Sequence, residues 1–383
     1  MKSILILTTV SGFLEKFERE NVRLLKEMGY KIHYAANADT PVYLDTASGF
    51  RRQGISFHNI SISKSPAAVF KNLRAYRQLK KIIKENDICA IHCHTPVGGL
   101  LGRLLGRKFK LKVIYTAHGF HFYKGASKLN NFIYTSAEKW LARFTDAIIT
   151  INKEDFDAAC GFCLKPGGKV YRINGVGLDT KKFTPVSAQE RKESRGRLNI
   201  KADELFIVSV GELNKNKNHE TVVIALGELL KETDLKIKYM ICGDGPYRAR
   251  LEEKIADLNL RDDVFTPGYV NDVRKVLWAA DLFIFPSKRE GLGMAAVEAL
   301  ASGIPVIAAD NRGSREYMAD GINGFVCISN TPAEYKELIT KFVQLDAGSR
   351  ERMKAECVRS AAPFGAENTA AVMKDAYGFL LNN

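Results

Sequence analysis

Apolar and polar positions divide the chain into two kinds of segment. Short runs of apolar, largely β-branched residues are typical of strands buried on both faces of a parallel sheet. Longer stretches with apolar residues three or four positions apart are typical of helices. In the first half, the predicted strands are 4–8, 31–35, 90–92, 112–116, 146–151 and 170–173. In the second half, they are 205–210, 237–242, 264–266, 282–285, 305–308 and 324–327.

Helical patterns lie between these strands. They cover 16–28, 67–86, 220–231, 247–258, 272–279, 294–301 and 366–381. Such alternation predicts an α/β protein with parallel, doubly wound sheets. A chain of 383 residues exceeds one ordinary core, and glycine and proline interrupt the pattern at 174–185. We therefore expect two Rossmann-like domains, 1–182 and 183–365, with ligands beyond the carboxyl ends of the strands in a central cleft that the domains face.

Composition narrows the class of protein. Hydrophobic residues make up 46% of the chain and charged residues 26%, as in a folded soluble protein. The apolar run at the N-terminus is too short for a signal sequence, and no stretch approaches the roughly 20 apolar residues of a membrane span. We expect a cytoplasmic protein.

A pair of cysteines and a pair of aspartates each resemble part of a metal-binding motif, and neither is strong evidence for a metal site. The seven cysteines lack disulfide-framework spacing, and Cys160 and Cys163 have no second pair beside them. Asp155 and Asp157 resemble a metal-binding acidic pair, but they stand at a predicted helix start, where capping explains them. We predict no metal site.

Positive charge is concentrated in the first half. Residues 1–182 contain 30 Lys and Arg against 14 Asp and Glu, whereas the remainder contains 27 against 29. In the basic segments 71–84 and 103–112, apolar residues are interleaved with the cations, which suits an anionic membrane surface. An ordinary surface helix of a basic protein is the alternative. No nucleic-acid-binding motif is present, so nucleic acid is excluded as a partner.

The most informative segment is 285–303 with the apolar run 304–308 that follows it; together they predict a strand, a glycine loop, a helix and a second strand. Gly291 and Gly293 allow close approach to a ligand, and the helix start beyond them presents free amides to an anion. Glu290 lies in the loop, and Glu298 lies within a nearly apolar helix that we expect to be buried. A ribose diol would satisfy that carboxylate. The alternative is a surface glutamate on an ordinary helix.

These motifs resemble those of the retaining glycosyltransferases of family 4. Glu290 and Glu298 have the family's Glu-x7-Glu spacing, within Pro-Ser-x-x-Glu-Gly-Leu-Gly and before Gly-x-Pro-Val-Ile-Ala. The chain looks like a bacterial capsule or exopolysaccharide member. The resemblance implies the GT-B fold, with the C-terminal helix 366–383 packing back on the first domain. It also implies that Glu290 contacts the donor sugar, that Glu298 holds the ribose, and that the amides of Gly291, Leu292 and Gly293 hold the diphosphate.

Other donor-side positions follow from the same resemblance. Gly211 and Lys217 match a Gly-Arg motif followed by lysine, but Glu212 stands where the arginine is expected. We hypothesise that Lys215 supplies the missing charge. The remaining nucleotide-pocket positions implied by the family are Gly243, Gly245, Tyr269 and Val270.

The first domain supplies the other implied positions. Gly12, which follows Ser11 after the first strand, allows approach to the donor phosphates. His118 ends a strand where the family places a catalytic histidine facing the donor sugar, together with Glu290. Ser11, His94 and His121 are assigned to the acceptor side.

The expected reaction is transfer of a hexose or N-acetylhexosamine, with retention, from a nucleoside-diphosphate sugar, with UDP favoured. The expected acceptor is a polyprenyl-diphosphate-linked saccharide, used by an enzyme bound peripherally to the inner face of the cell membrane. No cofactor or metal is expected. The alternatives are a soluble small acceptor, a UDP-sugar 2-epimerase of the same fold, and a non-catalytic module that binds nucleotide sugars.

Overall fold

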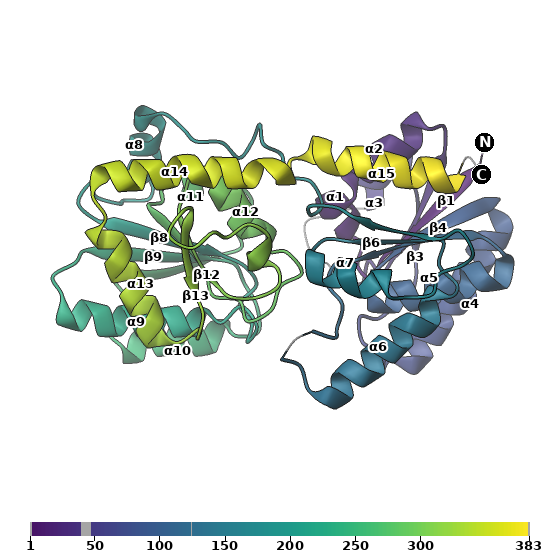
Figure 1. Cartoon of the computed structure of the whole chain (residues 1–383), viewed down its shortest axis with the longest axis horizontal. Helices are drawn as coiled ribbons and strands as arrows, with labels where there is room; N and C mark the ends of the chain where they lie inside the picture. Colours follow the sequence, from purple (N-terminus) through teal and green to yellow (C-terminus); the bar gives the residue numbers. More distant parts are fainter. Residues whose placement is uncertain (1, 40–46, 124, 382–383) are drawn as a thin grey trace. The chain divides into compact units, whose positions relative to one another are not determined.

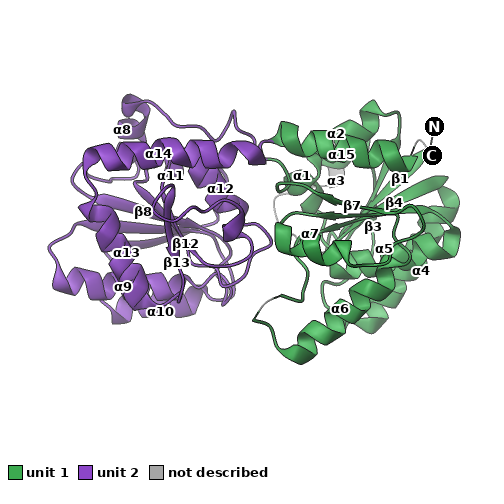
Figure 2. Ribbon diagram, in the orientation of Figure 1, with its two compact units in different colours: residues 1–177, 366–383 green, residues 178–365 purple. Residues whose placement is uncertain are grey.

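The chain forms two compact units. The computed structural model describes residues 2–39, 47–123 and 125–381. Unit 1 comprises residues 1–177 and 366–383, and unit 2 comprises residues 178–365 (Figure 2). The division therefore falls between Gly177 and Leu178, five residues before the predicted boundary, and the C-terminal helix belongs to unit 1.

Unit 1 contains a seven-stranded parallel sheet of order β3-β2-β1-β4-β5-β6-β7. Its strands are β1 (Ser3–Leu7), β2 (Lys31–Ala36), β3 (Ser56–Asn59), β4 (Ile88–His94), β5 (Lys112–Ala117), β6 (Ala147–Thr150) and β7 (Lys169–Arg172). The described helices are α1 (Phe13–Phe17), α2 (Arg19–Glu27), α3 (Ala47–Arg52), α4 (Val69–Glu85), α5 (Pro96–Phe109), α6 (Lys128–Ala142), α7 (Lys153–Cys160) and α15 (Ala366–Leu381). They lie on both sides of the sheet (Figure 1), and β1 is buried along its whole length as a result.

Unit 2 contains a six-stranded parallel sheet of order β10-β9-β8-β11-β12-β13. Its strands are β8 (Leu205–Val210), β9 (Ile237–Cys242), β10 (Val264–Gly268), β11 (Leu282–Phe285), β12 (Val306–Ala309) and β13 (Gly324–Cys327). The helices are α8 (Ala188–Arg197), α9 (His219–Glu232), α10 (Arg248–Asp257), α11 (Arg274–Ala279), α12 (Met294–Ala301), α13 (Pro332–Gln344) and α14 (Ala347–Ala361), with short 3-10 turns at Ser314–Glu316 and Ala362–Phe364.

Both sheets reverse their winding direction at one point. The first three strands of each unit run outward to one side, and the fourth returns to pair with the first, which makes β1/β4 and β8/β11 the switch points. In doubly wound sheets, ligands bind beyond the carboxyl ends of the strands at such points. The topology therefore directs attention to the loops after these four strands.

The α/β class with two doubly wound parallel sheets is confirmed, and so are the twelve predicted strands to within two residues at each end. The sequence prediction missed β3, whose Ser-Phe-His-Asn sequence has no apolar run because the strand lies at the sheet edge and pairs only with β2. The single helix predicted for 16–28 is divided into α1 and α2 at Glu18.

Glycines let α5 lie directly on the sheet. A Cβ added to Gly102 would approach the Cys93 side chain to 2.7 Å, and one added to Gly106 would lie 2.0 Å from Val113. On the same helix, the Arg103 guanidinium is buried, stacks 4.0 Å from the centre of the Tyr115 ring, and donates to Glu138 at 2.7 Å.

This burial removes Arg103 from the basic surface predicted for segment 103–112. Arg103 is fully buried, and Lys112 begins β5. Arg107, Lys108 and Lys110 are exposed. No helix within the described ranges is long and apolar enough to cross a membrane.

We expect Gly102→Ala to destabilise unit 1 by about 1–3 kcal/mol, because the new methyl group overpacks the contact between α5 and β4. Gly196→Ala in α8 is the matched control, because no atom lies within 4 Å of its added Cβ. There, helix propensity should leave stability unchanged or raise it by up to about 1 kcal/mol. Calorimetric unfolding of both variants checks this, and equal effects would contradict it.

Candidate functional site

The glycine loop of unit 2 follows β11, one of the two strands at its switch point. Gly293 is the N-cap of α12 and has a φ of +93°. A Cβ at this position would lie 2.5 Å from the Phe285 ring, so both the backbone conformation and the packing require glycine. The Leu292 side chain is buried and so anchors the loop that leads into α12, which begins at Met294.

Lys217 and Glu290 form an ion pair beside this loop. Lys217 Nζ lies 2.7 Å from Glu290 Oε1, and the two side chains are 20% and 15% exposed. The lysine stem passes Gly211, where an added Cβ would lie 3.3 Å from its Cδ and Cε, and its ammonium lies 5.0 Å from the centre of the Phe285 ring. The structure thus brings together two residues predicted for the donor site that are 73 positions apart.

Two further residues beneath the loop were missed by the sequence analysis. Arg312 is 7% exposed, and its Nε donates to the Glu290 carbonyl oxygen at 3.3 Å. The buried Tyr317 hydroxyl has no hydrogen-bond partner within the described part of the chain and lies 3.1 Å from the position of a Cβ on Gly293. Both residues follow β12, so they lie at the same sheet edge as the glycine loop. The signal available in the sequence was an arginine and a tyrosine directly after a predicted strand.

Gly243 and Gly245 have a packing role within unit 2. A Cβ on Gly243 would lie 1.8 Å from the Gly211 carbonyl oxygen, and one on Gly245 would lie 2.5 Å from the Leu213 carbonyl oxygen. These glycines therefore let the loop after β9 rest on the loop after β8. Beyond β10, the Tyr269 side chain is 58% exposed and that of Val270 is half-buried.

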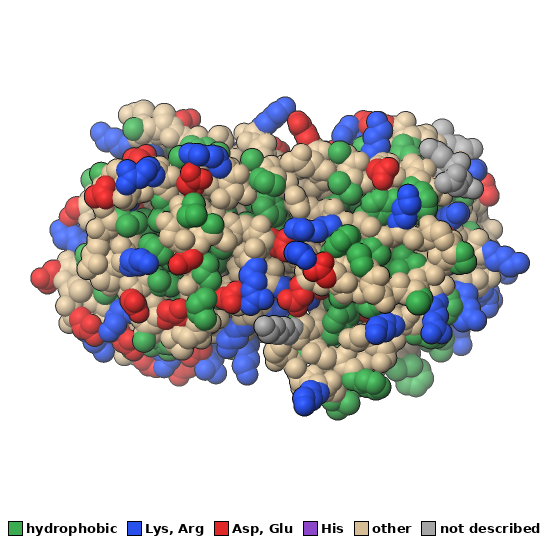
Figure 3. Space-filling model, in the orientation of Figure 1, with side chains coloured by type: hydrophobic (Ala, Val, Ile, Leu, Met, Phe, Trp, Pro, Cys, Tyr) green, Lys and Arg blue, Asp and Glu red, His purple; other side chains and the backbone are tan. Residues whose placement is uncertain are grey.

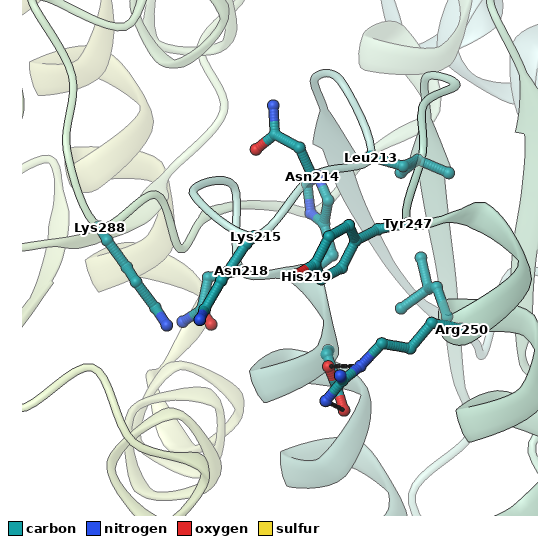
Figure 4. Close-up of a pocket in the computed structure, with 10 residues that line it drawn as sticks. Leu213, Asn214, Lys215, Asn218, His219, Tyr247, Arg250 and Lys288 are labelled. Carbon is teal, nitrogen blue, oxygen red and sulfur yellow. Dashed lines mark hydrogen bonds and ion pairs between the residues drawn. The ribbon is translucent and has the colours of Figure 1, made fainter.

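The remaining donor-side predictions have mixed placements. Glu298 is half-buried on α12, less enclosed than its apolar helix suggested. Glu212 is exposed and accepts a hydrogen bond from Asn214 at 2.9 Å. Lys215 is exposed and lines a separate cavity, shown in Figure 4, whose lining includes neither Lys217 nor Glu290. The hypothesis is that Lys215 supplies the charge missing at Glu212; the structure places Lys215 at a cavity that neither Lys217 nor Glu290 lines.

Unit 1 has a cluster of titratable groups at its own switch point. His94 ends β4, and His118 follows β5. His94 Nδ1 lies 3.2 Å from His118 Nε2 and 3.5 Å from Glu18 Oε1. The Phe13 ring packs on both imidazoles, with centroid distances of 5.5 Å to His94 and 5.0 Å to His118.

Burial makes this cluster neutral at pH 7. It raises the pKa of Glu18 to about 8, against a smaller lowering by the hydrogen bond from Asn21. It lowers the pKa of His118 to about 4 and that of His94 well below 6.5. His118 is therefore an uncharged hydrogen-bonding group, and the acidic proton of the cluster resides on Glu18.

Glu18 was not among the predicted site residues. It lies between α1 and α2, at helical spacing from Leu14, Val22 and Leu25, all of which are buried. A carboxylate within an apolar helical stripe is unusual unless it has partners, and this was the signal available in the sequence.

A second imidazole layer connects the cluster to the C-terminal helix. The Tyr377 hydroxyl on α15 lies 2.8 Å from His92 Nδ1, and His92 Nε2 lies 2.8 Å from the Thr116 hydroxyl. The rings of His92 and His94 are 4.1 Å apart. The last helix of the chain thus supports β4 directly behind the cluster.

Glu18, His94 and His118 are also a group able to hold a metal ion. Each offers one ligand atom, and these atoms lie within 4.8 Å of one another. Two imidazoles and a carboxylate are ligands that zinc accepts. By contrast, Asn152 caps α7 by accepting from the Asp155 amide, and Asp157 pairs with Lys153, so these acids have local structural roles.

An apolar cavity of about 350 Å³ lies next to the cluster in unit 1. Phe13 and Phe17 line it together with Val10, and His121 contributes a polar side chain whose ring centre is 5.2 Å from that of Tyr134. The full lining is Thr9, Val10, Phe13, Phe17, Lys64, Pro66, Thr95, Pro96, His121 and Tyr134.

The other two predicted positions near this cavity are Ser11 and Gly12. Ser11 is 7% exposed. Gly12, the N-cap of α1, has a φ of −68°, a conformation open to any residue. The backbone conformation at Gly12 therefore does not require glycine.

Comparisons with family models and with known proteins identify glycosyltransferases. The Glycosyl transferases group 1 family matches residues 190–357, and the Glycosyl transferase 4-like family matches residues 4–152. The chain is 36% identical over 380 residues to EpsD of Bacillus subtilis (strain 168), which is named as a glycosyltransferase, covering 98% of this chain and 96% of EpsD.

Two further proteins are similar to this chain. The chain is 27% identical to UDP-Gal:alpha-D-GlcNAc-diphosphoundecaprenol alpha-1,3-galactosyltransferase of Escherichia coli, over 68% of this chain and 67% of that one. The crystal structure of HepE of Anabaena in complex with UDP and glucose is similar in fold, with a TM-score of 0.77, 18% identity and full coverage of both chains.

Glu18 should make stability fall as the pH rises. Its pKa in the folded protein lies above the ordinary 4.5, so its contribution is complete below pH 4.5 and is lost as the pH rises to about 8. Glu18→Gln removes this titration. Between pH 4.5 and 8, we expect wild type to lose on the order of a few kcal/mol relative to the variant, at about 1.4 kcal/mol per pKa unit.

Thermal unfolding of wild type, Glu18→Gln and the control Glu20→Gln, whose side chain is 42% exposed, across this pH range measures the difference. The histidines titrate in all three proteins and cancel in the comparison. Parallel curves for wild type and Glu18→Gln would show that Glu18 is not protonated in the folded state.

Proposed function

Because the chain belongs to the group 1 glycosyl transferases, we propose that it transfers a sugar, with retention in the manner of family 4, from a UDP-sugar to a lipid-linked saccharide in surface polysaccharide synthesis. The observation that carries this proposal is the Lys217–Glu290 pair beside the glycine loop. An acid for the sugar and a cation for the leaving diphosphate stand together at a helix start.

The donor is proposed to bind to unit 2. The amides of Gly291, Leu292 and Gly293 hold the diphosphate, as expected at a helix N-terminus. Lys217 neutralises its charge and exchanges part of its contact with Glu290 for the phosphates. Arg312, held beneath the loop by the Glu290 carbonyl, adds positive charge to this region in place of the arginine absent at position 212.

The base and ribose occupy the adjoining positions. Glu298 on α12 accepts from the ribose hydroxyls, and the backbone around Tyr269 and Val270 contacts the base. Gly243 and Gly245 support this pocket by keeping the loops after β8 and β9 packed together.

Catalysis is proposed to act by stabilising separated charge. The bond between the anomeric carbon and the phosphate oxygen breaks, which leaves positive charge on the sugar and negative charge on the diphosphate. The acceptor hydroxyl attacks the same face, and its proton passes to a phosphate oxygen. Glu290 orients the sugar, and neutral His118 hydrogen-bonds to a sugar hydroxyl.

The acceptor is proposed to bind to unit 1. Phe13, Phe17 and Val10 give the cavity beside His118 an apolar wall suited to a lipid-linked substrate, and Lys64 offers a cation to its phosphate. His121 and Ser11 are the proposed polar contacts to the sugar. His94 is assigned a positioning role, because it is buried behind His118.

Two helices of unit 1 have surfaces suited to an anionic membrane. On α4, Phe70 is 90% exposed among Lys71, Arg74 and Arg77. On α6, the side chains of Leu129, Phe132 and Ile133 are 52–71% exposed. Figure 3 shows green apolar and blue basic side chains at the lower edge of unit 1, where α6 lies in Figure 1. Exposed apolar groups flanked by cations favour insertion at a lipid headgroup layer.

UDP-sugar binding should raise the thermal stability of unit 2 without added metal and in the presence of EDTA. At a ligand concentration 100-fold above the dissociation constant, the stabilisation is about 2.7 kcal/mol, or roughly 5–10 °C for a domain of this size. Glu298→Gln should abolish most of this shift, and the exposed control Glu228→Gln should retain it. Thermal unfolding against a panel of nucleotides and nucleotide sugars makes the measurement.

That unfolding experiment and an activity assay with the same nucleotide sugars have informative outcomes. No response to any nucleotide would contradict the proposed donor. Activity lost with EDTA and restored by Zn²⁺ would contradict metal independence and point to Glu18, His94 and His118. Conversion of a UDP-sugar without an acceptor would favour a 2-epimerase, whereas binding without turnover would favour a non-catalytic module.

We expect the protein to co-sediment with vesicles containing anionic phospholipid, and binding to weaken as salt rises. Phe70→Ser combined with Phe132→Ser should reduce binding at all salt concentrations, because it removes insertion and leaves charge intact. Thr135→Ser, which lies on α6 and is half-buried, is a conservative control. Absence of salt-sensitive binding would favour the soluble acceptor.

A further inference from the structure

A cavity in unit 2, of about 200 Å³, lies where α9 and α10 begin (Figure 4). It is distinct from the Lys217–Glu290 pair, since neither residue lines it. The lining residues that matter for its chemistry are Lys215, Asn218, His219, Tyr247, Arg250 and Lys288.

The cavity has an excess of positive charge. Arg250 is already neutralised by a two-point contact with Glu220, at 3.0 and 3.1 Å. Lys215 and Lys288 are exposed and form no ion pair within the described part of the chain. In Figure 4 the ends of these two lysines and of Asn218 point toward the same region. Two uncompensated ammonium groups thus converge on one cavity.

The backbone holds these two lysines in place. Lys288 N donates to the Asn216 carbonyl oxygen at 2.8 Å, and Asn216 Nδ2 donates to the Arg289 carbonyl oxygen, also at 2.8 Å. These bonds tie the loop after β8 to the loop after β11. The lysines are therefore carried by two joined loops.

A buried histidine supplies an independent sign of a ligand. His219 is the first residue of the 14-residue α9, is 5% exposed, and lines the cavity. Neither of its ring nitrogens has a hydrogen-bond partner among the described residues. Burial, and to a lesser extent Lys217, lower its pKa to about 3, so the neutral ring offers one N–H donor. A buried polar group in this state is costly unless something satisfies it.

The helix start adds further donors. Asn218 is the N-cap of α9 but makes no side-chain cap hydrogen bond; its amide donates to Asn330 at 3.1 Å and its carbonyl accepts from Thr221 at 3.0 Å. No side chain caps α10 at Tyr247 either. First-turn amides left without a side-chain cap attract anions.

We infer that this cavity is a phosphate-binding site, separate from the donor-sugar site, in which Lys215 and Lys288 contact a phosphate or pyrophosphate group and His219 donates to it. Lysine ammonium groups act as point charges for phosphate, and the start of α9 complements them. The volume is large enough for inorganic phosphate, pyrophosphate or a small phosphomonoester. The inference does not depend on the identity of the donor.

Calorimetric titration of the full chain with pyrophosphate, at constant ionic strength and after saturation with UDP, tests the inference. Saturation fills the proposed donor site, so we expect one further equivalent to bind. Lys215→Ala combined with Lys288→Ala should weaken it at least about tenfold for each lysine removed. Lys231→Ala combined with Lys275→Ala removes the same charge from exposed positions on unit 2 and should leave the affinity unchanged.

No uptake by the UDP-saturated protein, or equal affinity in the two double variants, would overturn the inference. If UDP itself does not bind, the proposed donor fails, and the same titration is made on the protein alone. In that case the inference holds only if pyrophosphate binding persists in Lys217→Ala and is lost in the variant that combines Lys215→Ala with Lys288→Ala. Parallel titrations with inorganic phosphate and a hexose phosphate identify which phosphate source binds more tightly.

Discussion

The structure depends on one constraint, the parallel pairing of strands around two switch points. Parallel strands require crossover connections, so all carboxyl ends of a sheet meet at one edge. In unit 1, this brings the loop after β1 beside the ends of β4 and β5; in unit 2, it brings the loop after β8 beside that after β11. The proposed catalytic and donor-binding groups stand at these edges because the strand order leaves them no other place.

The two sites differ in charge state, because one holds an ion pair and the other is neutral. Glu290 keeps a cation, Lys217, at 2.7 Å and forms an ion pair. Glu18 is buried beside two neutral imidazoles, so protonation is the less costly state. Unit 2 therefore offers charges matched to a diphosphate, whereas unit 1 offers uncharged hydrogen-bonding groups beside an apolar cavity. That division suits a reaction in which charge develops on the leaving group and the acceptor enters as a neutral hydroxyl.

Close packing at glycines makes the loops of unit 2 interdependent. Gly243 and Gly245 seat the loop after β9 on that after β8, and a Cβ on Gly313 would lie 2.6 Å from the Leu292 carbonyl oxygen. The glycine loop after β11, the loop after β8 that carries Lys217, and the segment after β12 thus form one packed layer. The loops after β8 and β11 also carry Lys215 and Lys288, which line the cavity where α9 and α10 begin.

The sequence by itself determined the two-sheet architecture, twelve strands, the helix start at Met294 and the motif around Glu290, because apolar periodicity and glycine placement are local properties. Edge strand β3 was not predicted, because it buries too little apolar surface to produce an apolar run in the sequence. Only the tertiary structure decided that Glu18 joins His94 and His118, that Arg312 lies beneath the glycine loop, and that Lys215 lines a cavity that Lys217 does not line. These facts depend on which side chains the folded sheets bring within a few ångströms, and no local pattern contains that information.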